Sequence, residues 1–157
     1  MDLILWRHAE AQEWPAGDPR TRTDLERALT SRGERQAARM AQWLDRQLPG
    51  SARILSSPAR RCEQTAQALE RRFRICNELA PGATAAQLLE LAQWPQGKSS
   101  VLVIGHQPTL GQAVAQLLGL PSSDFALKKG ALWWLRSRER DGQRQTIVVA
   151  VQSPEML

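Results

Sequence analysis

Two histidines, the only ones in the chain, each follow directly on a short apolar run. His8 comes after residues 2–6 and Arg7, and His106 comes after residues 101–104 and Gly105. A short apolar run bounded by turn residues predicts a buried strand, most naturally in a parallel sheet. Ligands of open α/β sheets bind just outside the carboxyl ends of such strands. We therefore expect both imidazoles at one catalytic edge; the alternative is two unrelated histidines, one in a core and one on a loop.

The residues around these histidines favour an anion over a metal. Ser57-Pro58 and Gln107-Pro108 look like helix starts that follow strands, and helix N-termini present unpaired N–H groups to anions. Arg7 and an arginine of the pair Arg60-Arg61 would add cations suited to a phosphoryl group. Two histidines without further ligands at metal-binding spacing make a poor metal site, so we expect neither a metal nor another cofactor.

The elements that must position these residues alternate along the chain. We expect strands at 2–6, 53–56, 74–77 and 100–105, and a final hairpin of 131–136 and 146–151 that turns at Asp141-Gly142. Helices are expected from a capping box at 31–34 to residue 48, from 57–58 onward, over 84–94, and from Pro108 onward. Residues 9–30 are predicted to form a polar loop over the catalytic edge. The pattern predicts a three-layer α/β domain whose mainly parallel sheet has an antiparallel edge.

Length and composition limit the possibilities further. A chain of 157 residues is expected to form one domain, residues 1–157, with a core of its own. The net charge of +5 comes mostly from scattered arginines, and no basic block alternates with aromatics as in many nucleic-acid binders. Cys62 and Cys76 are too few for a disulfide framework. We expect a cytoplasmic protein, because no signal peptide or membrane span is recognisable.

Three ordered motifs resemble those of the histidine phosphatase superfamily. They are Arg7-His8, the run from Ser56 to Ala66 with the sequence SSPARRCEQTA, and Gly105-His106-Gln107-Pro108. The short length and the stretch 29–33 (LTSRG) resemble the SixA-type phosphohistidine phosphatase branch. Ala9 stands where the family usually has glycine, a small change that should be tolerated. The resemblance implies a phosphoglycerate mutase-like fold.

The resemblance also implies a mechanism and assigns the residues. His8 would be the nucleophile and would form a phosphohistidine intermediate that water hydrolyses. Arg7, Arg61 and a protonated His106 would bind the equatorial phosphoryl oxygens. The family spacing Ser-Pro-x-x-Arg selects Arg61, and Arg60 is expected to face solvent because adjacent helical residues point about 100° apart.

A general acid is harder to assign. Glu78 fits the spacing of a glutamate four residues before a glycine in related phosphomonoesterases, but it could equally be a loop residue. Phosphohistidine has less need of an acid, because its imidazole leaving group can be protonated before the P–N bond breaks. Glu10 is expected to contact arginines of the loop.

The resulting expectation is a phosphatase that acts on phosphohistidine of a protein, such as a histidine phosphotransfer domain, and releases inorganic phosphate. Little chain remains for a lid over the site, and the basic balance suits an acidic phosphoprotein. We expect no nucleic-acid or membrane partner. Two alternatives remain: a phosphatase of small phosphate esters that uses Glu78, or a non-catalytic phosphate or nucleic-acid binder.

Overall fold

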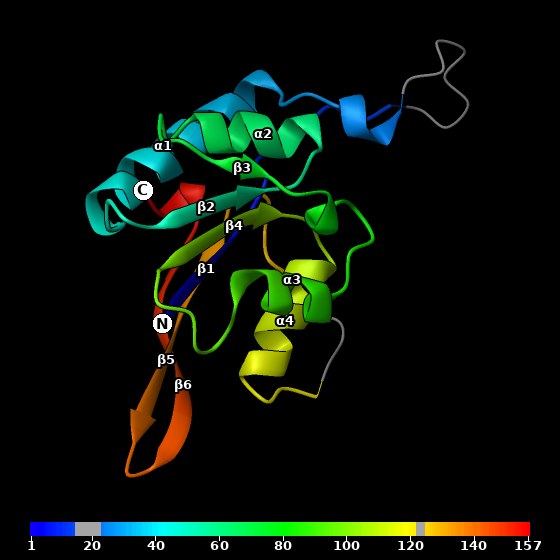
Figure 1. Cartoon of the computed structure of the whole chain (residues 1–157). Helices are drawn as coiled ribbons and strands as arrows, with labels where there is room; N and C mark the ends of the chain where they lie inside the picture. Colours follow the sequence, from blue (N-terminus) through cyan, green and yellow to red (C-terminus); the bar gives the residue numbers. More distant parts are fainter. Residues whose placement is uncertain (15–22, 122–124) are drawn as a thin grey trace.

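A six-stranded sheet lies at the centre of the computed structural model, which describes residues 1–14, 23–121 and 125–157 (Figure 1). The strand order is β3-β2-β4-β1-β5-β6. The bounds are β1 Asp2–Arg7, β2 Arg53–Ser56, β3 Arg74–Ile75, β4 Val101–Gly105, β5 Leu132–Arg140 and β6 Gln143–Gln152. The first four strands pair in parallel, whereas β5 pairs antiparallel with β1 and with β6. The mainly parallel sheet with an antiparallel edge is therefore confirmed.

Four α-helices cover the two faces of the sheet. They are α1 Ser31–Gln47, α2 Arg60–Gln67, α3 Ala85–Ala92 and α4 Thr109–Leu117, with short 3₁₀ turns η1 Asp24–Glu26, η2 Asn77–Leu79 and η3 Pro154–Met156. Figure 1 shows α1 and α2 on one face and α3 and α4 on the other. The three-layer arrangement is as predicted.

Alternation along the strands divides the core into two layers. Leu3 and Leu5 of β1 join the cluster under α3 and α4, and Ile4 and Trp6 join the cluster under α1 and α2. Successive strand side chains point to opposite faces, so a strand buried on both sides appears as a continuous apolar run. This is why the runs at 2–6 and 101–104 were recognisable as central strands.

Two predicted helix starts were wrong in detail. The N-cap of α1 is Thr30, whose Oγ1 accepts a hydrogen bond from the Gly33 amide at 2.9 Å, so the cap lies one residue before the predicted box at 31–34, and Gly33 has no side chain to complete a box. Helix α2 has Ala59 as its N-cap and begins at Arg60, not at Ser57-Pro58. The Ser57 hydroxyl accepts a hydrogen bond from the amide of Ala59 at 3.2 Å, ahead of the helix, and lies against His106 on its other side.

Other boundaries also differ from the prediction. The hairpin strands are longer than 131–136 and 146–151, and they extend beyond the body of the molecule in Figure 1. Within the predicted polar loop at 9–30, residues 24–26 form η1 and Ala11 bridges Leu29, while residues 15–22 lie outside the described part. Among the described helices, none is long and apolar enough to cross a membrane.

Gly130 connects two residues near the end of β1. The Trp6 indole Nε1 donates to the Gly130 carbonyl at 2.9 Å, and the Gly130 amide donates to the His8 carbonyl at 3.0 Å. Trp6 is completely buried. The backbone of His8 is thereby fixed from the side of β5 as well as from β4.

Candidate active site

Three neighbouring parallel strands deliver the candidate residues to one edge of the sheet. Strand β4 lies between β2 and β1, and the hydrogen-bond ladder continues one residue past each strand end. The His8 amide donates to the Gly105 carbonyl at 3.2 Å, and the Ser57 amide donates to the Ile104 carbonyl at 3.0 Å. The ring centroids of His8 and His106 are 5.3 Å apart. The structure thus brings the two histidines together, as the sequence predicted.

His8 is held in one tautomer. Its Nδ1 lies 2.8 Å from the carbonyl oxygen of Ala9, so Nδ1 carries the proton and donates it. The other ring nitrogen, Nε2, is then unprotonated, and its lone pair accepts only a weak hydrogen bond from the Arg61 Nε at 3.4 Å. Burial lowers the pKa of His8 to about 3, and the neighbouring His106, Arg61 and Arg7 add to this effect. His8 is therefore a neutral imidazole with an available Nε2 at physiological pH.

His106 is oriented by two partners on opposite sides of its ring. Its Nε2 lies 2.7 Å from the Ser57 hydroxyl oxygen, and its Nδ1 lies 3.3 Å from the Arg61 Nη2. Since the guanidinium can only donate, Nδ1 accepts and Nε2–H donates to Ser57 in the empty site. Burial, and then the charge of Arg61, lowers the pKa of His106 to about 4. In this state the ring is neutral and its Nδ1 faces the Arg61 guanidinium.

Arg61 lies between the two imidazoles, and Arg60 does not. Arg61 is buried and Arg60 is exposed, which separates the two adjacent arginines as predicted. The Arg61 guanidinium also donates to Asp24 of η1, through Nη1 to the carbonyl at 2.8 Å and through Nη2 to the carboxylate at 3.0 Å. Partial burial opposes ionisation of Asp24, but hydrogen bonds and charges from Arg27 and Arg61 outweigh it and lower the pKa of Asp24.

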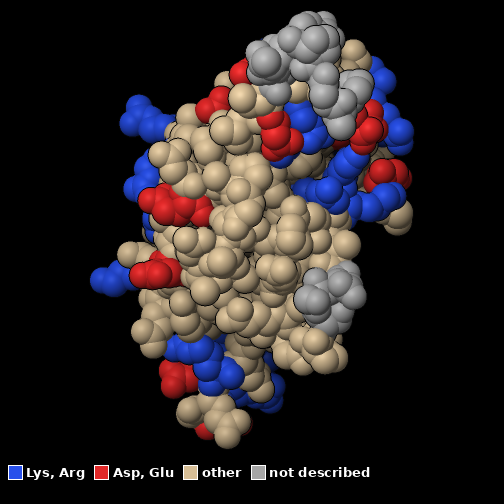
Figure 2. All heavy atoms as spheres, turned by 90° about the vertical axis from the view of Figure 1, so that its right-hand side faces the viewer, with Lys and Arg blue, Asp and Glu red and all other residues tan. Residues whose placement is uncertain are grey.

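Arg7 adds a second guanidinium close to Arg61 and the two imidazoles. Its Nη1 donates to the Leu127 carbonyl at 2.7 Å, whereas its buried Nε has no hydrogen-bond partner within the described part of the chain. Burial, followed by the charge of Arg61, lowers the pKa of Arg7. Two close guanidiniums, two neutral imidazoles and a buried donor without a partner form a site whose electrostatics call for an anion. On the face shown in Figure 2, Lys and Arg side chains gather in the upper right, with a few acidic side chains among them.

The predicted acid is not brought to this site by any contact in the structure. Glu78 lies exposed on η2, within electrostatic reach of Arg74. Glu10 accepts a hydrogen bond from the Thr30 hydroxyl at 2.9 Å and lies 3.7 Å from the guanidinium of Arg32, which belongs to α1 and not to the loop whose arginines were expected to contact it. Among the described residues, no group of three or more His, Cys, Asp or Glu side chains is placed to hold a metal ion.

Two residues of the site were missed by the sequence reasoning. Ser57 was interpreted as a helix cap, yet its hydroxyl contacts His106. Asp24 is 37 positions from Arg61 in the sequence and was assigned only to a polar loop. The signal for Ser57 was its position directly after a strand that ends at the same edge as His106, whereas nothing in the local pattern pointed to Asp24.

A buried, uncharged thiol is a further and weak hydrogen-bond partner of His106. The Cys62 Sγ lies 3.5 Å from the His106 Nε2. Burial raises the pKa of the Cys62 thiol to about 12, so the group stays protonated. It fills space behind the imidazole as a small apolar side chain.

Comparison with known proteins agrees with this geometry. The family model of the histidine phosphatase superfamily (branch 1) matches residues 3–84. A phosphohistidine phosphatase SixA homolog of Haemophilus influenzae is 29% identical over 98% of this chain and 97% of its own, and phosphohistidine phosphatase SixA of Escherichia coli is 34% identical over 74% of each. The solved structure of the protein histidine phosphatase SixA complexed with tungstate is 27% identical, covers 99% of both chains and superposes with a TM-score of 0.78.

The order of the motifs, the fold and the positions of the two histidines lead to one assignment. The chain belongs to the histidine phosphatase superfamily, is of the SixA type and is a phosphatase.

Proposed function

We propose that this phosphatase removes the phosphoryl group from phosphohistidine on a protein, through a covalent intermediate on His8. The observation that carries the proposal is the His8 tautomer: Nδ1–H is fixed by the Ala9 carbonyl at 2.8 Å, so Nε2 is the free nucleophile. Nε2 faces the side of the pocket where Arg61 lies. A neutral imidazole nitrogen positioned against cations is suited to in-line attack on phosphorus.

The proposed reaction has two displacements. In the first, the lone pair of the His8 Nε2 forms a bond to phosphorus while the P–N bond to the substrate imidazole breaks, and the protonated substrate ring leaves as neutral imidazole. In the second, water attacks the phosphorus of phospho-His8 and the His8 Nε2 leaves with its electron pair. The products are unmodified protein histidine and inorganic phosphate. His8 keeps its Nδ1 proton and leaves as a neutral imidazole, while both protons of the attacking water remain with the product as dihydrogen phosphate, which can release one of them to solvent.

Arg7, Arg61 and His106 are proposed to bind the equatorial oxygens. Both guanidiniums already converge on the pocket, and the unpartnered Nε of Arg7 gains an acceptor when a phosphoryl group enters. A phosphate dianion beside His106 raises the pKa of that ring, so that Nδ1 becomes protonated and donates to phosphate. Ser57 keeps accepting from Nε2–H throughout, which leaves Nδ1 directed at the phosphoryl oxygens.

The substrate class follows from the leaving group and from the relatives. An alkoxide leaving group needs a proton from a general acid, whereas a protonated imidazole does not. Glu78, the candidate acid, is exposed and has no contact with His8 or His106 in the structure. The similar proteins of Haemophilus influenzae and Escherichia coli carry the name phosphohistidine phosphatase, which supports the same substrate here. A histidine phosphotransfer domain is the kind of partner we propose.

The test compares two substrates and one nucleophile variant. Purified protein is given a phosphohistidine-bearing protein and para-nitrophenyl phosphate, and kcat/KM is measured for each. We expect preference for phosphohistidine, and His8→Ala should lose both turnover and the acid-labile phosphoenzyme. Phosphatase activity that is unchanged in His8→Ala contradicts the covalent mechanism. Preference for the ester, lost in Glu78→Gln, instead supports a phosphomonoesterase.

A further inference from the structure

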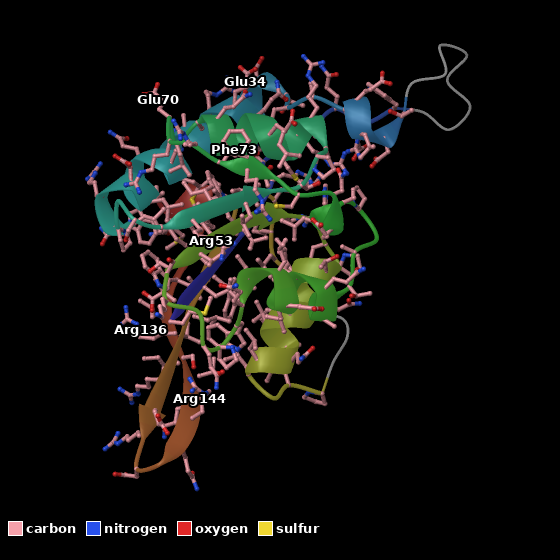
Figure 3. All side chains as sticks on the ribbon, in the orientation of Figure 1. Glu34, Arg53, Glu70, Phe73, Arg136 and Arg144 are labelled. Atoms are coloured by element: carbon pink, nitrogen blue, oxygen red, sulfur yellow. The ribbon has the colours of Figure 1, made fainter. Side chains whose placement is uncertain are left out.

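Helix α1 carries four arginines on one flank. Arg32, Arg35, Arg39 and Arg46, the α1 arginine stripe, lie within about 60° of one another around the axis of the helix at 100° per residue. The acidic residues of the helix, Glu34 and Asp45, fall outside this sector, and Glu34 points outward at the top of the view in Figure 3. The stripe is exposed along its whole length. The positive charge on this flank is therefore concentrated instead of being interspersed with carboxylates.

The first three arginines of the stripe are unfavourable for the helix that carries them, whereas Arg46 lies in the last turn, where a cation suits the helix dipole. Like charges at i,i+3 and i,i+4, here Arg32 with Arg35 and Arg35 with Arg39, destabilise a helix. Cations in the first turns also oppose the helix dipole. Within the described part of the chain, Arg35 and Arg39 have no ion pair, and Arg32 has only a long contact of 3.7 Å with Glu10. An arrangement that costs stability and leaves Arg35 and Arg39 without an ion pair among the described residues suits an external acidic partner.

A shallow groove runs along the stripe. Two adjoining hollows of about 240 and 380 Å³ lie between α1 and the C-terminal η3, and Arg39 lines both. Trp43 and Leu157 contribute apolar surface to the second hollow. The one carboxylate that lines the first, Glu155, is 3.5 Å from the Lys128 ammonium. The groove thus offers guanidiniums to the acidic side chains of a peptide and apolar surface to its apolar side chains.

The groove begins beside the active site. Arg32 contacts Glu10, which is two residues after His8, and the Thr30 amide donates to the Glu10 carbonyl at 3.0 Å. From Arg32 to Arg46 the helix rises about 21 Å, at 1.5 Å per residue. A peptide of about ten extended residues spans at least this distance. A protein segment that continues from a residue bound at His8 can therefore reach the stripe.

We propose that this groove binds an acidic segment of the phosphoprotein substrate, beside the phosphohistidine that enters the active site. The inference rests on the proposed function for the nature of that partner. The guanidiniums pair with Asp and Glu side chains of the segment, and Trp43 and Leu157 contact its apolar parts. The groove therefore increases substrate affinity without touching the reacting atoms.

The test uses two synthetic peptides, each with one phosphohistidine followed by a ten-residue tail rich in either glutamate or glutamine. For wild type we expect kcat/KM to be about tenfold higher with the glutamate tail, through KM, and the preference to fall as salt is raised. Arg35→Gln/Arg39→Gln/Arg46→Gln should abolish the preference and leave kcat unchanged. The control Arg72→Gln/Arg138→Gln/Arg140→Gln removes three positive charges from exposed sites elsewhere. This control should keep the preference for the glutamate tail.

The possible outcomes test the groove and the proposed function separately. A preference that survives in the stripe variant, or that is lost equally in the control, overturns the groove. Failure of wild type to cleave either peptide overturns the proposed function, and the groove is then tested by fluorescence anisotropy of the unphosphorylated glutamate peptide. If the unphosphorylated glutamate peptide binds wild type and the stripe variant with the same affinity, the proposed groove is refuted. Tighter stripe-dependent binding of a short DNA duplex or of anionic vesicles would also refute an acidic protein segment as its ligand.

Discussion

Replacement of Ser57 by alanine tests the orientation of His106 directly. The Ser57 hydroxyl is completely buried and is 2.7 Å from the His106 Nε2. With it removed, Nε2–H loses its oxygen acceptor and keeps only the weaker Cys62 Sγ at 3.5 Å, while Arg61 remains on the other side of the ring. The Ala59 amide also loses the Ser57 hydroxyl, which accepts from it at 3.2 Å. The proposed reaction needs a protonated His106 with Nδ1 toward phosphate, so the change should weaken binding of the transition state more than it weakens the fold.

The expected fall in kcat/KM of Ser57→Ala follows from the charge of the His106 ring in the proposed reaction. A hydrogen bond to a charged group contributes about 1.5–3 kcal/mol, which corresponds to a fall in kcat/KM of roughly 10- to 150-fold. The same loss should lower the pKa of His106 in the phosphate complex by about one to two units. The effect on the free energy of unfolding should be smaller, about 1–2 kcal/mol, because His106 is neutral in the empty site.

Ser56 provides the matched control. It is the preceding residue and equally buried, but its hydroxyl donates to the Ser57 carbonyl at 2.9 Å and does not contact His106. Ser56→Ala should cost a similar amount of stability and leave kcat/KM close to that of wild type. Activity is measured on a phosphohistidine-bearing protein, and the ¹⁵N shifts of His106 are followed by NMR with and without phosphate.

The reasoning would be refuted by equal activities of the two serine variants. It would also fail if Ser57→Ala lowered kcat/KM while the pKa of His106 in the phosphate complex stayed the same. In that case the hydroxyl would contribute in some way other than by holding the ring.

Three further predictions concern the fold and the ionisation of the site. Gly33→Ala should cost about 1–3 kcal/mol in urea unfolding, since a Cβ there would overlap the Glu10 carbonyl oxygen; an unchanged midpoint argues against this close approach. Burial lowers the pKa of His8 to about 3 and of His106 to about 4, whereas unfolded histidine titrates near 6.5. Their contribution to stability should be complete above about pH 6.5 and be lost toward pH 4, by up to about 1.4 kcal/mol per pH unit each, in phosphate-free buffer. A profile that is flat between these pH values is inconsistent with neutral buried rings. Glu78→Gln should leave kcat/KM for phosphohistidine nearly unchanged, and a large loss would restore this glutamate as the acid.

The sequence was most informative for site residues whose positions follow from the local pattern of the strand or helix that carries them. His8 and His106 could be placed together because each follows an apolar strand and parallel strands present their carboxyl ends at one edge. Arg61 could be separated from Arg60 by helical geometry and by the family spacing. These inferences need no knowledge of distant contacts.

Contacts between distant segments could not be predicted in the same way. A serine after a strand can cap a helix or bind a side chain, and only the position of the His106 ring decides between them for Ser57. Asp24 reaches Arg61 because η1 folds back over α2. The polar pattern of residues 9–30 does not predict this contact between η1 and α2. The extension of β5 and β6 was missed because their outer parts are polar and exposed.

The link from Trp6 through Gly130 to His8 gives this enzyme an intrinsic spectroscopic probe. The indole N–H of Trp6 is buried and bonded to the carbonyl of the residue whose amide holds the His8 backbone. Its NMR resonance should be shielded from exchange with solvent and sensitive to small movements of the His8 backbone. The phosphorylation of His8 that we propose could thus be followed in real time in the unlabelled protein, without any chromophoric substrate.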